Sequence, residues 1–375
     1  MGGKRVLFFT EAWGLGGIET FVMGAIRALD HGPYSFEIFS VHDWSDAHDE
    51  ELARLCVERH VVFHGNKPSL VSRFDAGRKA WRSLLERKSY NAVHVNAMNG
   101  LALAYVADAK RAGVPLCIAH SHNTDFGEGG RLAKGAIHRL GRARYAGTPD
   151  VRLACSEDAG RYLFGDRSFM VLKNGIDVDR FAFDERQRTA VRGALGISDE
   201  VLLFGAVGRI DAQKNPVFQV AILRELVSRG VACSLLLVGS GPLEEEVLKR
   251  AQRWGVADRL IMPGSTRTPE RYLSALDVVT MPSEFEGLPF SLVEAVDNGL
   301  PCFVTEGVGE GVFTGASIEW LATDDPALWA ERLSGLDRVS SLRRRPLGCG
   351  VTEASGFDRA ETMRALDSIY SGERG

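Results

Sequence analysis

The sequence has few of the features that mark secreted, membrane-spanning or zinc-binding proteins. Its six cysteines are scattered through 375 residues and none forms a CxxC pair, which argues against a disulfide framework or a zinc site. No uncharged apolar run approaches the roughly 20 residues that a membrane-spanning helix needs. The only early apolar run, residues 6–9, is followed by Glu11 and predicts no secretory signal. These absences predict a cytoplasmic protein with reduced thiols in its core.

The composition that remains is that of a globular protein: 45% of residues are hydrophobic, 25% are charged, and the net charge is −4. A chain of 375 residues exceeds one ordinary core and predicts two domains. Apolar β-rich runs alternate with helix-length amphipathic segments, which is typical of parallel α/β sheets. Strands are predicted at residues 5–10, 36–41, 61–64, 92–96, 116–120, 151–156 and 170–172, and again at 201–207, 234–238, 259–262, 278–281, 302–305 and 318–321. Helices are predicted at 19–29, 101–112, 216–228, 243–254 and 359–370.

The most informative motif spans residues 283–294, directly after a predicted strand. It joins two carboxylates, Glu286 and Glu294, through a Gly-Leu-Pro turn that opens a predicted helix. Carboxylates accept hydrogen bonds from sugar hydroxyls, and a helix amino terminus favours phosphate. The motif therefore suits a ligand that carries both groups. The alternative is a solvated helix with two surface glutamates.

A second motif, at residues 204–215, places two cations after a buried strand. The strand ends in Gly208, Arg209 follows, and Lys214 comes five residues later, just before a predicted helix. Two fixed cations can stabilise the negative charge that grows on a departing phosphate. A single cation at a strand end is more often a solvated charge.

Together these motifs resemble the E-x7-E signature of the retaining glycosyltransferases of family 4, in particular the enzymes of capsular and exopolysaccharide biosynthesis. The resemblance implies an α/β protein of the GT-B fold, with two Rossmann-like doubly wound domains facing a central cleft. The expected parts are an acceptor-binding domain at residues 1–172, a linker at 173–185, a nucleotide-sugar-binding domain at 186–355, and a helix crossing back to the first domain at 356–375.

The resemblance also implies roles for single residues. Arg209 and Lys214 would grip the donor diphosphate, Glu286 would hold hydroxyls of the transferred sugar, and Glu294 would bind the ribose. The remaining donor-binding candidates are Gly16, Gly17, Gly208, Gly239, Gly264, Ser265, Gly287, Phe290 and Ser291. Among these, Gly239, Gly264 and Ser265 follow strands and suit ordinary strand-to-helix turns equally well.

Two histidines, His120 and His122, end the predicted strand at residues 116–120. By resemblance His122 is the better candidate to face the sugar and His120 the second; a histidine merely satisfied in the loop is the alternative. No third metal ligand accompanies them. Asp177 and Asp179 spell the DxD metal motif of unrelated transferases, but their surroundings match the linker. We therefore expect no metal and no other cofactor.

Two basic stretches, residues 73–88 and 131–144, remain to be explained. The second carries basic side chains and no acid. Helices of this kind can lie on an anionic membrane, which a lipid-linked acceptor would explain, or they can simply present solvated faces.

The predicted function is transfer of a hexose or N-acetylhexosamine from a nucleotide-diphosphate sugar, a uridine nucleotide in preference to a guanosine one, to a hydroxyl of a saccharide or lipid-linked acceptor. The reaction would be retaining and metal-independent, and would serve polysaccharide or glycoconjugate biosynthesis in the cytoplasm or at the inner face of the plasma membrane. No nucleic-acid partner is expected. A nucleotide-sugar isomerase or hydrolase and a non-catalytic donor-binding subunit remain alternatives.

Overall fold

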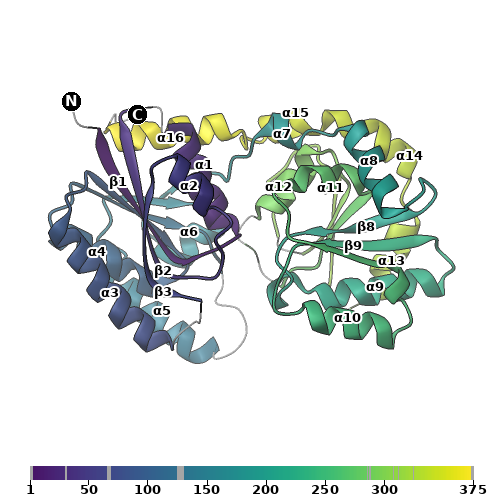
Figure 1. Ribbon diagram of the computed structural model, residues 1–375, viewed down its shortest axis with the longest axis horizontal. Helices are drawn as coiled ribbons and strands as arrows, with labels where there is room; N and C mark the ends of the chain where they lie inside the picture. Colours follow the sequence, from purple (N-terminus) through teal and green to yellow (C-terminus); the bar gives the residue numbers. More distant parts are fainter. Residues whose placement is uncertain are drawn as a thin grey trace. The chain divides into compact units, whose positions relative to one another are not determined.

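The protein is described by a computed structural model that covers residues 3–29, 32–65, 69–124, 131–284, 286, 289–306, 308–310, 312–323 and 325–372. It divides into two compact units, Met1–Asn174 with Ala360–Gly375, and Gly175–Arg359. Each unit is a parallel sheet flanked by helices (Figure 1), which confirms the predicted α/β class.

The sheet of the first unit has the strand order β3-β2-β1-β4-β5-β6-β7, and all its pairs are parallel. The chain therefore switches direction across the sheet between β1 and β4, and loops at the carboxyl ends of strands beside such a point commonly bind ligands. The strands are β1 (Lys4–Trp13), β2 (Tyr34–Asp43), β3 (Glu58–His64), β4 (Ala92–Ala97), β5 (Leu116–Ser121), β6 (Val151–Ala154) and β7 (Met170–Val171).

Helices cover both faces of this sheet (Figure 1). On one face, Phe9 of β1 packs against Trp81 of α3 and Tyr105 of α4. On the other, His94 of β4 packs against Phe21 of α1 and Tyr370 of α16. The helices are α1 (Gly17–Leu29), α2 (Asp49–Arg54), α3 (Leu70–Arg87), η1 (Gly100–Ala102), α4 (Leu103–Arg111), α5 (Arg131–Tyr145), α6 (Glu157–Phe164) and α16 (Arg359–Ser371).

Polar contacts attach the carboxyl-terminal helix α16 to the rest of the first unit. The Lys4 ammonium donates to the carbonyl of Ser371 at 2.9 Å, and the Tyr34 hydroxyl lies 2.5 Å from the Asp367 carboxylate. The Tyr370 hydroxyl lies 2.8 Å from Nδ1 of the buried His94. The end of the chain is thereby fixed to the sheet formed by its beginning.

The sheet of the second unit has the order β10-β9-β8-β11-β12-β13 and is also parallel. Its strands are β8 (Leu202–Val207), β9 (Cys233–Val238), β10 (Leu260–Gly264), β11 (Val278–Met281), β12 (Cys302–Thr305) and β13 (Ile318–Leu321). Its helices are α7 (Val178–Phe181), α8 (Glu185–Leu195), η2 (Ala212–Lys214), α9 (Pro216–Ser228), α10 (Glu244–Arg253), η3 (Ala257–Arg259), α11 (Pro269–Ala275), α12 (Phe290–Asp297), α13 (Pro326–Ser334), α14 (Arg338–Arg344), η4 (Arg345–Leu347) and α15 (Gly348–Ala354).

One buried cation joins α12 to its neighbours. Arg345 is 1% exposed and donates to the carbonyls of Asn298 at 3.0 Å, Leu276 at 2.7 Å and Leu273 at 2.9 Å. Its guanidinium also stacks on the ring of Phe183. These bonds satisfy carbonyls near the carboxyl ends of α11 and α12, where a helix leaves acceptors unpaired.

Residues 175–185, predicted as part of a linker, pack within the second unit. Ile176 pairs with Asp358, and the Arg180 guanidinium lies 2.9 Å from Glu270. The boundary between the two units therefore falls between Asn174 and Gly175, at the start of this segment.

Candidate active site

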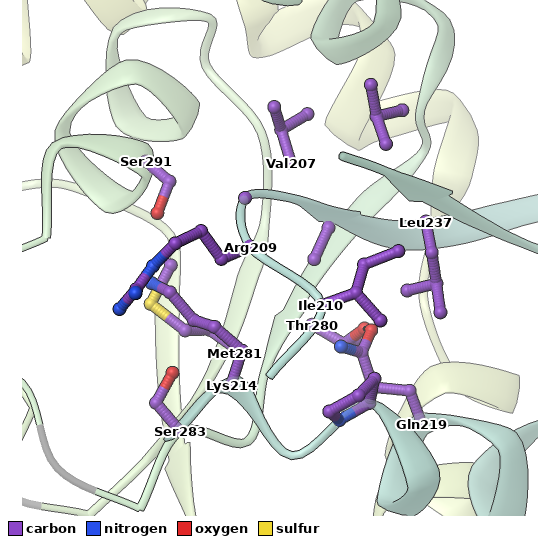
Figure 2. Close-up of a pocket in the computed structure, with 14 residues that line it drawn as sticks. Val207, Arg209, Ile210, Lys214, Gln219, Leu237, Thr280, Met281, Ser283 and Ser291 are labelled. Carbon is purple, nitrogen blue, oxygen red and sulfur yellow. The ribbon is translucent and has the colours of Figure 1, made fainter. Parts of the chain in front are cut away.

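A pocket opens at the carboxyl edge of the second sheet, formed by the ends of β8, β9 and β11 and the start of α12. Figure 2 shows the side chains of Arg209 and Lys214 extending to the same side of this pocket, near the hydroxyls of Ser283 and Ser291. The base of the pocket is apolar or neutral. The lining residues are Ala206, Val207, Gly208, Arg209, Ile210, Lys214, Pro216, Gln219, Leu237, Val238, Thr280, Met281, Ser283 and Ser291.

The loop after β8 fixes both cations. The Asp211 carboxylate accepts a hydrogen bond from the Lys214 amide at 3.2 Å, which caps the short helix η2. It also lies 3.1 Å from the Arg209 guanidinium. Asn215 then takes a left-handed conformation, with φ of 48°, and Pro216 begins α9. The sequence thus builds a tight turn from which both side chains project.

The predicted catalytic residues Lys214 and Glu286 are in direct contact. The Lys214 ammonium lies 2.7 Å from a Glu286 carboxylate oxygen, and their side chains are 19% and 10% exposed. The two loops are also joined by their backbones, because the Glu284 amide donates to the Gln213 carbonyl at 2.9 Å. Gly287 lies outside the described residues.

Glycines let the neighbouring loops approach one another. A Cβ atom at Gly239 would lie 1.9 Å from the Gly208 carbonyl oxygen, so no side chain fits there. The Gly239 amide donates to the Gly264 carbonyl at 3.0 Å, and the Ser240 and Ser265 hydroxyls are 2.7 Å apart. Gly208, Gly239, Gly264 and Ser265 therefore lie on three adjoining loops, as consecutive strand ends in one parallel sheet should.

Helix α12 starts at Phe290, and Ser291 in its first turn faces the pocket. Glu294 follows one turn later. Burial raises the pKa of Glu294 to about 7, since the charge of Glu270 adds to the effect and the cations Arg180 and Lys214 only partly oppose it. Its pKa is set by burial and by nearby charges, and no hydrogen bond from another described residue contributes to it. A ligand hydroxyl could therefore donate such a bond.

In the first unit, the Gly-rich loop after β1 is organised by Glu19. The buried Glu19 carboxylate accepts a hydrogen bond from the Gly14 amide at 3.0 Å. A Cβ at Gly16 would lie 2.7 Å from the same carboxylate, and Gly17 begins α1. The loop is compact because its glycines leave room for the acid.

The two candidate histidines differ in exposure. His120 is fully buried, and its Nδ1 lies 3.2 Å from Nε2 of His94. His122 is half-buried at the carboxyl edge of the sheet, and its Nε2 lies 2.8 Å from Oδ1 of Asn96. Burial lowers the pKa of His122 to about 3, so the ring is neutral at physiological pH. Exposure favours His122 over His120 as the residue that can reach a ligand.

Asn96, which we did not predict as a functional residue, sets the tautomer of His122. The Asn96 amide nitrogen donates to the Phe9 carbonyl at 3.1 Å, so its oxygen must face the imidazole. That oxygen can only accept, which places the proton of His122 on Nε2 and leaves Nδ1 as an acceptor. The signal in the sequence was a polar residue at the end of the apolar strand beside β5.

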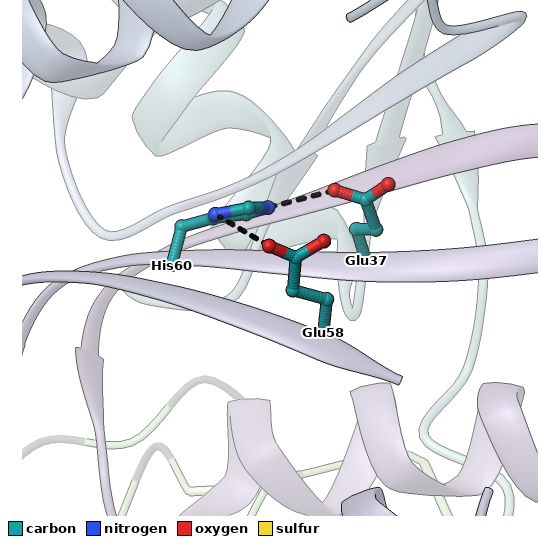
Figure 3. Close-up of side chains that lie close together, drawn as sticks. All are labelled: Glu37, Glu58 and His60. Atoms are coloured by element: carbon teal, nitrogen blue, oxygen red, sulfur yellow. Dashed lines mark hydrogen bonds and ion pairs between the residues drawn. The ribbon is translucent and has the colours of Figure 1, made fainter. Parts of the chain in front are cut away.

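Two groups of acidic side chains contact cations of the protein itself. Glu37, Glu58 and His60 lie close together (Figure 3), but the Lys88 ammonium contacts both carboxylates and lies 2.9 Å from Glu37. Asp177 caps α7 and forms an ion pair with Arg359 at 2.8 Å. Both groups therefore take part in ion pairs within the described part of the chain.

Comparison with known proteins identifies the family. The model for "Glycosyltransferase Family 4" matches residues 15–180, and that for "Glycosyl transferases group 1" matches residues 201–337. The chain belongs to glycosyltransferase family 4. This membership confirms the predicted resemblance and the enzyme class.

Relatives and solved structures agree with the family assignment. The chain is 29% identical to the putative glycosyltransferase EpsF of Bacillus subtilis, over 98% of this chain and 96% of the relative. It is 28% identical to the UDP-Gal:alpha-D-GlcNAc-diphosphoundecaprenol alpha-1,3-galactosyltransferase of Escherichia coli, over 76% of each chain. Anabaena HepE in complex with UDP and glucose superposes with a TM-score of 0.77 at 16% identity, over 98% of this chain and 99% of that chain. The predicted GT-B fold is thereby confirmed.

Proposed function

We propose that this glycosyltransferase moves a hexose or N-acetylhexosamine from a UDP-sugar to a hydroxyl of a saccharide or lipid-linked acceptor, with retention of configuration. The single observation that carries the proposal is that Arg209 and Lys214 line one pocket at the carboxyl edge of the sheet, with Glu286 in contact with Lys214. Complexes of HepE with UDP and with UDP-glucose, and the UDP-Gal donor in the name of the E. coli relative, support uridine as the base.

The pocket supplies the charges that a diphosphate leaving group needs. The donor diphosphate would lie against Arg209 and Lys214, with the amides at the start of α12 next to it. The bond between the anomeric carbon and the β-phosphate oxygen breaks, and its electron pair goes to that oxygen. Two preorganised cations stabilise this charge, each contributing about 3–4 kcal/mol. We propose that they act without a metal ion.

Glu286 and Glu294 would orient the donor. With a diphosphate present, the Lys214 ammonium can turn from Glu286 to phosphate, which leaves the Glu286 carboxylate to accept hydrogen bonds from sugar hydroxyls. Glu294 would accept from the ribose. In the first unit, His122 would offer Nδ1 as an acceptor to a hydroxyl of the sugar or acceptor.

Retention is proposed to follow from attack on the face that the leaving group vacates. The acceptor oxygen forms its bond to the anomeric carbon on that face, and its proton passes to the departing phosphate oxygen. NMR of the product formed from an α-linked donor tests this step. An α-linked product supports the proposal, and a β-linked product contradicts it.

The pKa of Glu294 gives the donor step a pH dependence. Because that pKa is about 7 in the free protein and the ribose hydroxyls favour the carboxylate, kcat/KM for the donor should rise with pH through about 7. The Glu294→Gln variant should lose that rise. If kcat/KM of the wild type for the donor stays constant between pH 6 and 8, Glu294 does not bind the ribose as proposed.

Assays with a panel of nucleotide sugars would identify the donor and separate the alternatives. Turnover that requires an acceptor supports transfer, and stoichiometric conversion of donor alone would point to a hydrolase or isomerase. Parallel assays with excess EDTA test the metal-independent mechanism. Loss of turnover in EDTA that Mg²⁺ or Mn²⁺ restores would refute it.

A further inference from the structure

Helix α5 presents its apolar side to solvent. The exposed residues of the helix include Leu132, which is 89% exposed, Leu140, which is 71% exposed, and Ile137. With 100° between successive residues, these three and the exposed Ala133, Ala136 and Ala143 fall on one face that spans about 140°. In most helices of a soluble domain such a face packs against the core.

The side of α5 that packs on the domain explains why its apolar side can face solvent. Gly141 approaches Gly100 so closely that a Cβ on Gly141 would lie 2.5 Å from the Gly100 backbone. His138 accepts a hydrogen bond from the Gly100 amide at 3.0 Å, and its other ring nitrogen lies 3.0 Å from the Tyr162 carbonyl. Close backbone packing and hydrogen bonds therefore hold the helix on the domain. The leucines are not needed for that.

The charge on α5 narrows the choice of partner. The helix contains no Asp or Glu, and two of its arginines are exposed with the apolar face. Arg139 lies at the edge of that face, and Arg144 lies within it in the last turn of the helix. A symmetric contact between two copies would bring these arginines together and so be opposed by like charges. An anionic lipid surface satisfies both features, because it accepts apolar side chains below its charged headgroups.

We propose that α5 docks the first unit onto an anionic bilayer, with Leu132, Ile137 and Leu140 entering the interface and Arg139 and Arg144 at the headgroups. None of the helices in the described part of the chain combines the length and hydropathy needed to cross a bilayer. Docking would therefore be peripheral.

Helix α5 begins near the edge of the first sheet at which we propose that the acceptor binds. The helix follows β5, so its first residues, Leu132 among them, lie at the carboxyl edge of the sheet, where His122 also lies. Helix α3 follows β3 and opens at the same edge with the exposed Leu70 and Val71. A bilayer held there would bring the headgroup of a lipid-linked acceptor to the edge proposed to bind it.

Sedimentation with vesicles tests the proposal without any sugar donor, so its outcome is separate from that of the proposed function. The probe is a vesicle of equal parts phosphatidylcholine and phosphatidylglycerol, compared with pure phosphatidylcholine. The wild type should bind the anionic vesicles, and raising the salt concentration should weaken binding. No binding to the anionic vesicles would overturn the proposal.

Matched substitutions locate the contact. Leu132→Gln and Leu140→Gln should each weaken vesicle binding about tenfold, since each removes a leucine from the interface. Leu248→Gln, at an exposed position of helix α10, is the control and should bind like the wild type. Equal binding by all three variants would place the contact elsewhere and refute the role of α5.

Charge variants and the oligomeric state complete the test. Arg139→Glu and Arg144→Glu together should abolish the preference for anionic vesicles, while Arg253→Glu on α10 should retain it. Sedimentation velocity without lipid distinguishes a second copy as the partner. A wild-type dimer that the Leu140→Gln variant converts to a monomer would overturn membrane docking in favour of self-association.

Discussion

Replacing Lys214 by methionine is the perturbation that bears most directly on the proposed chemistry. Methionine keeps much of the length and apolar volume of the lysine stem and removes the charge. In the wild type the Lys214 ammonium lies 2.7 Å from the Glu286 carboxylate, and both side chains are more than four-fifths buried. The substitution therefore has two separable consequences, one for stability and one for catalysis.

The effect on stability should be modest. Removing Lys214 leaves the largely buried Glu286 carboxylate with one cation fewer, which should lower the free energy of unfolding by about 1–3 kcal/mol. Glu286→Gln removes the charge that needs that cation. The double variant should therefore be less destabilised than the sum of the single variants, by about 0.5–3 kcal/mol.

The effect on catalysis should be larger and should not be rescued in this way. Loss of one preorganised group facing the leaving phosphate lowers kcat by about 10²- to 10³-fold. Lys214→Met and the double variant should both show that loss, and Lys214→Arg, which keeps the charge, should lose less. Steady-state kinetics with the true donor and urea unfolding of the same samples give both quantities. A folded Lys214→Met variant with kcat within about tenfold of the wild type would refute the leaving-group role.

Three further predictions follow from the geometry. Asn96→Leu removes the acceptor that fixes the His122 tautomer and should lower kcat about tenfold. In ¹⁵N NMR the His122 imidazole of this variant should show mixed tautomers. An unchanged tautomer would contradict the role of Asn96. Arg345→Met should lower the free energy of unfolding by about 3–5 kcal/mol, because it leaves buried carbonyls unpaired. The control Arg344→Met, at the exposed neighbouring position, should lower it by less than about 0.5 kcal/mol. Equal losses would be inconsistent with the role of the buried guanidinium. Burial raises the pKa of Asp297 to about 7, so the folded state keeps this carboxyl protonated at a pH where the unfolded state has lost the proton. The carboxyl therefore adds at most about 4 kcal/mol to the free energy of unfolding at low pH, and this stability is lost as pH rises from about 4 through about 7. Asp297→Asn should flatten that decline in urea unfolding, and an unchanged slope would contradict it.

The strands could be predicted because their sequences are nearly continuous apolar runs, as buried parallel strands require. The predictions for 278–281, 302–305 and 318–321 match β11, β12 and β13 at both ends. The position of the pocket cations was also predictable, because Gly208 directly follows a buried strand and the polar turn after it must lie at the carboxyl end of that strand. For the site, the sequence indicated which residues are present and at which edge of the sheet.

Contacts between distant segments could not be predicted in this way. The Lys214–Glu286 ion pair joins residues that are 72 positions apart, on loops whose spacing depends on the order of β8 and β11 in the sheet. The outward face of α5 was missed because periodicity identifies an apolar stripe but not the direction in which it points. That direction depends on the close contact between Gly100 and Gly141, which only the tertiary structure reveals.

A crystal structure of the complex with UDP would show whether Arg209 and Lys214 hold the diphosphate. We expect β-phosphate oxygens within about 3 Å of both the Arg209 guanidinium and the Lys214 ammonium, and an open Lys214–Glu286 contact. A diphosphate bound elsewhere on the protein, with that ion pair intact, would contradict this expectation.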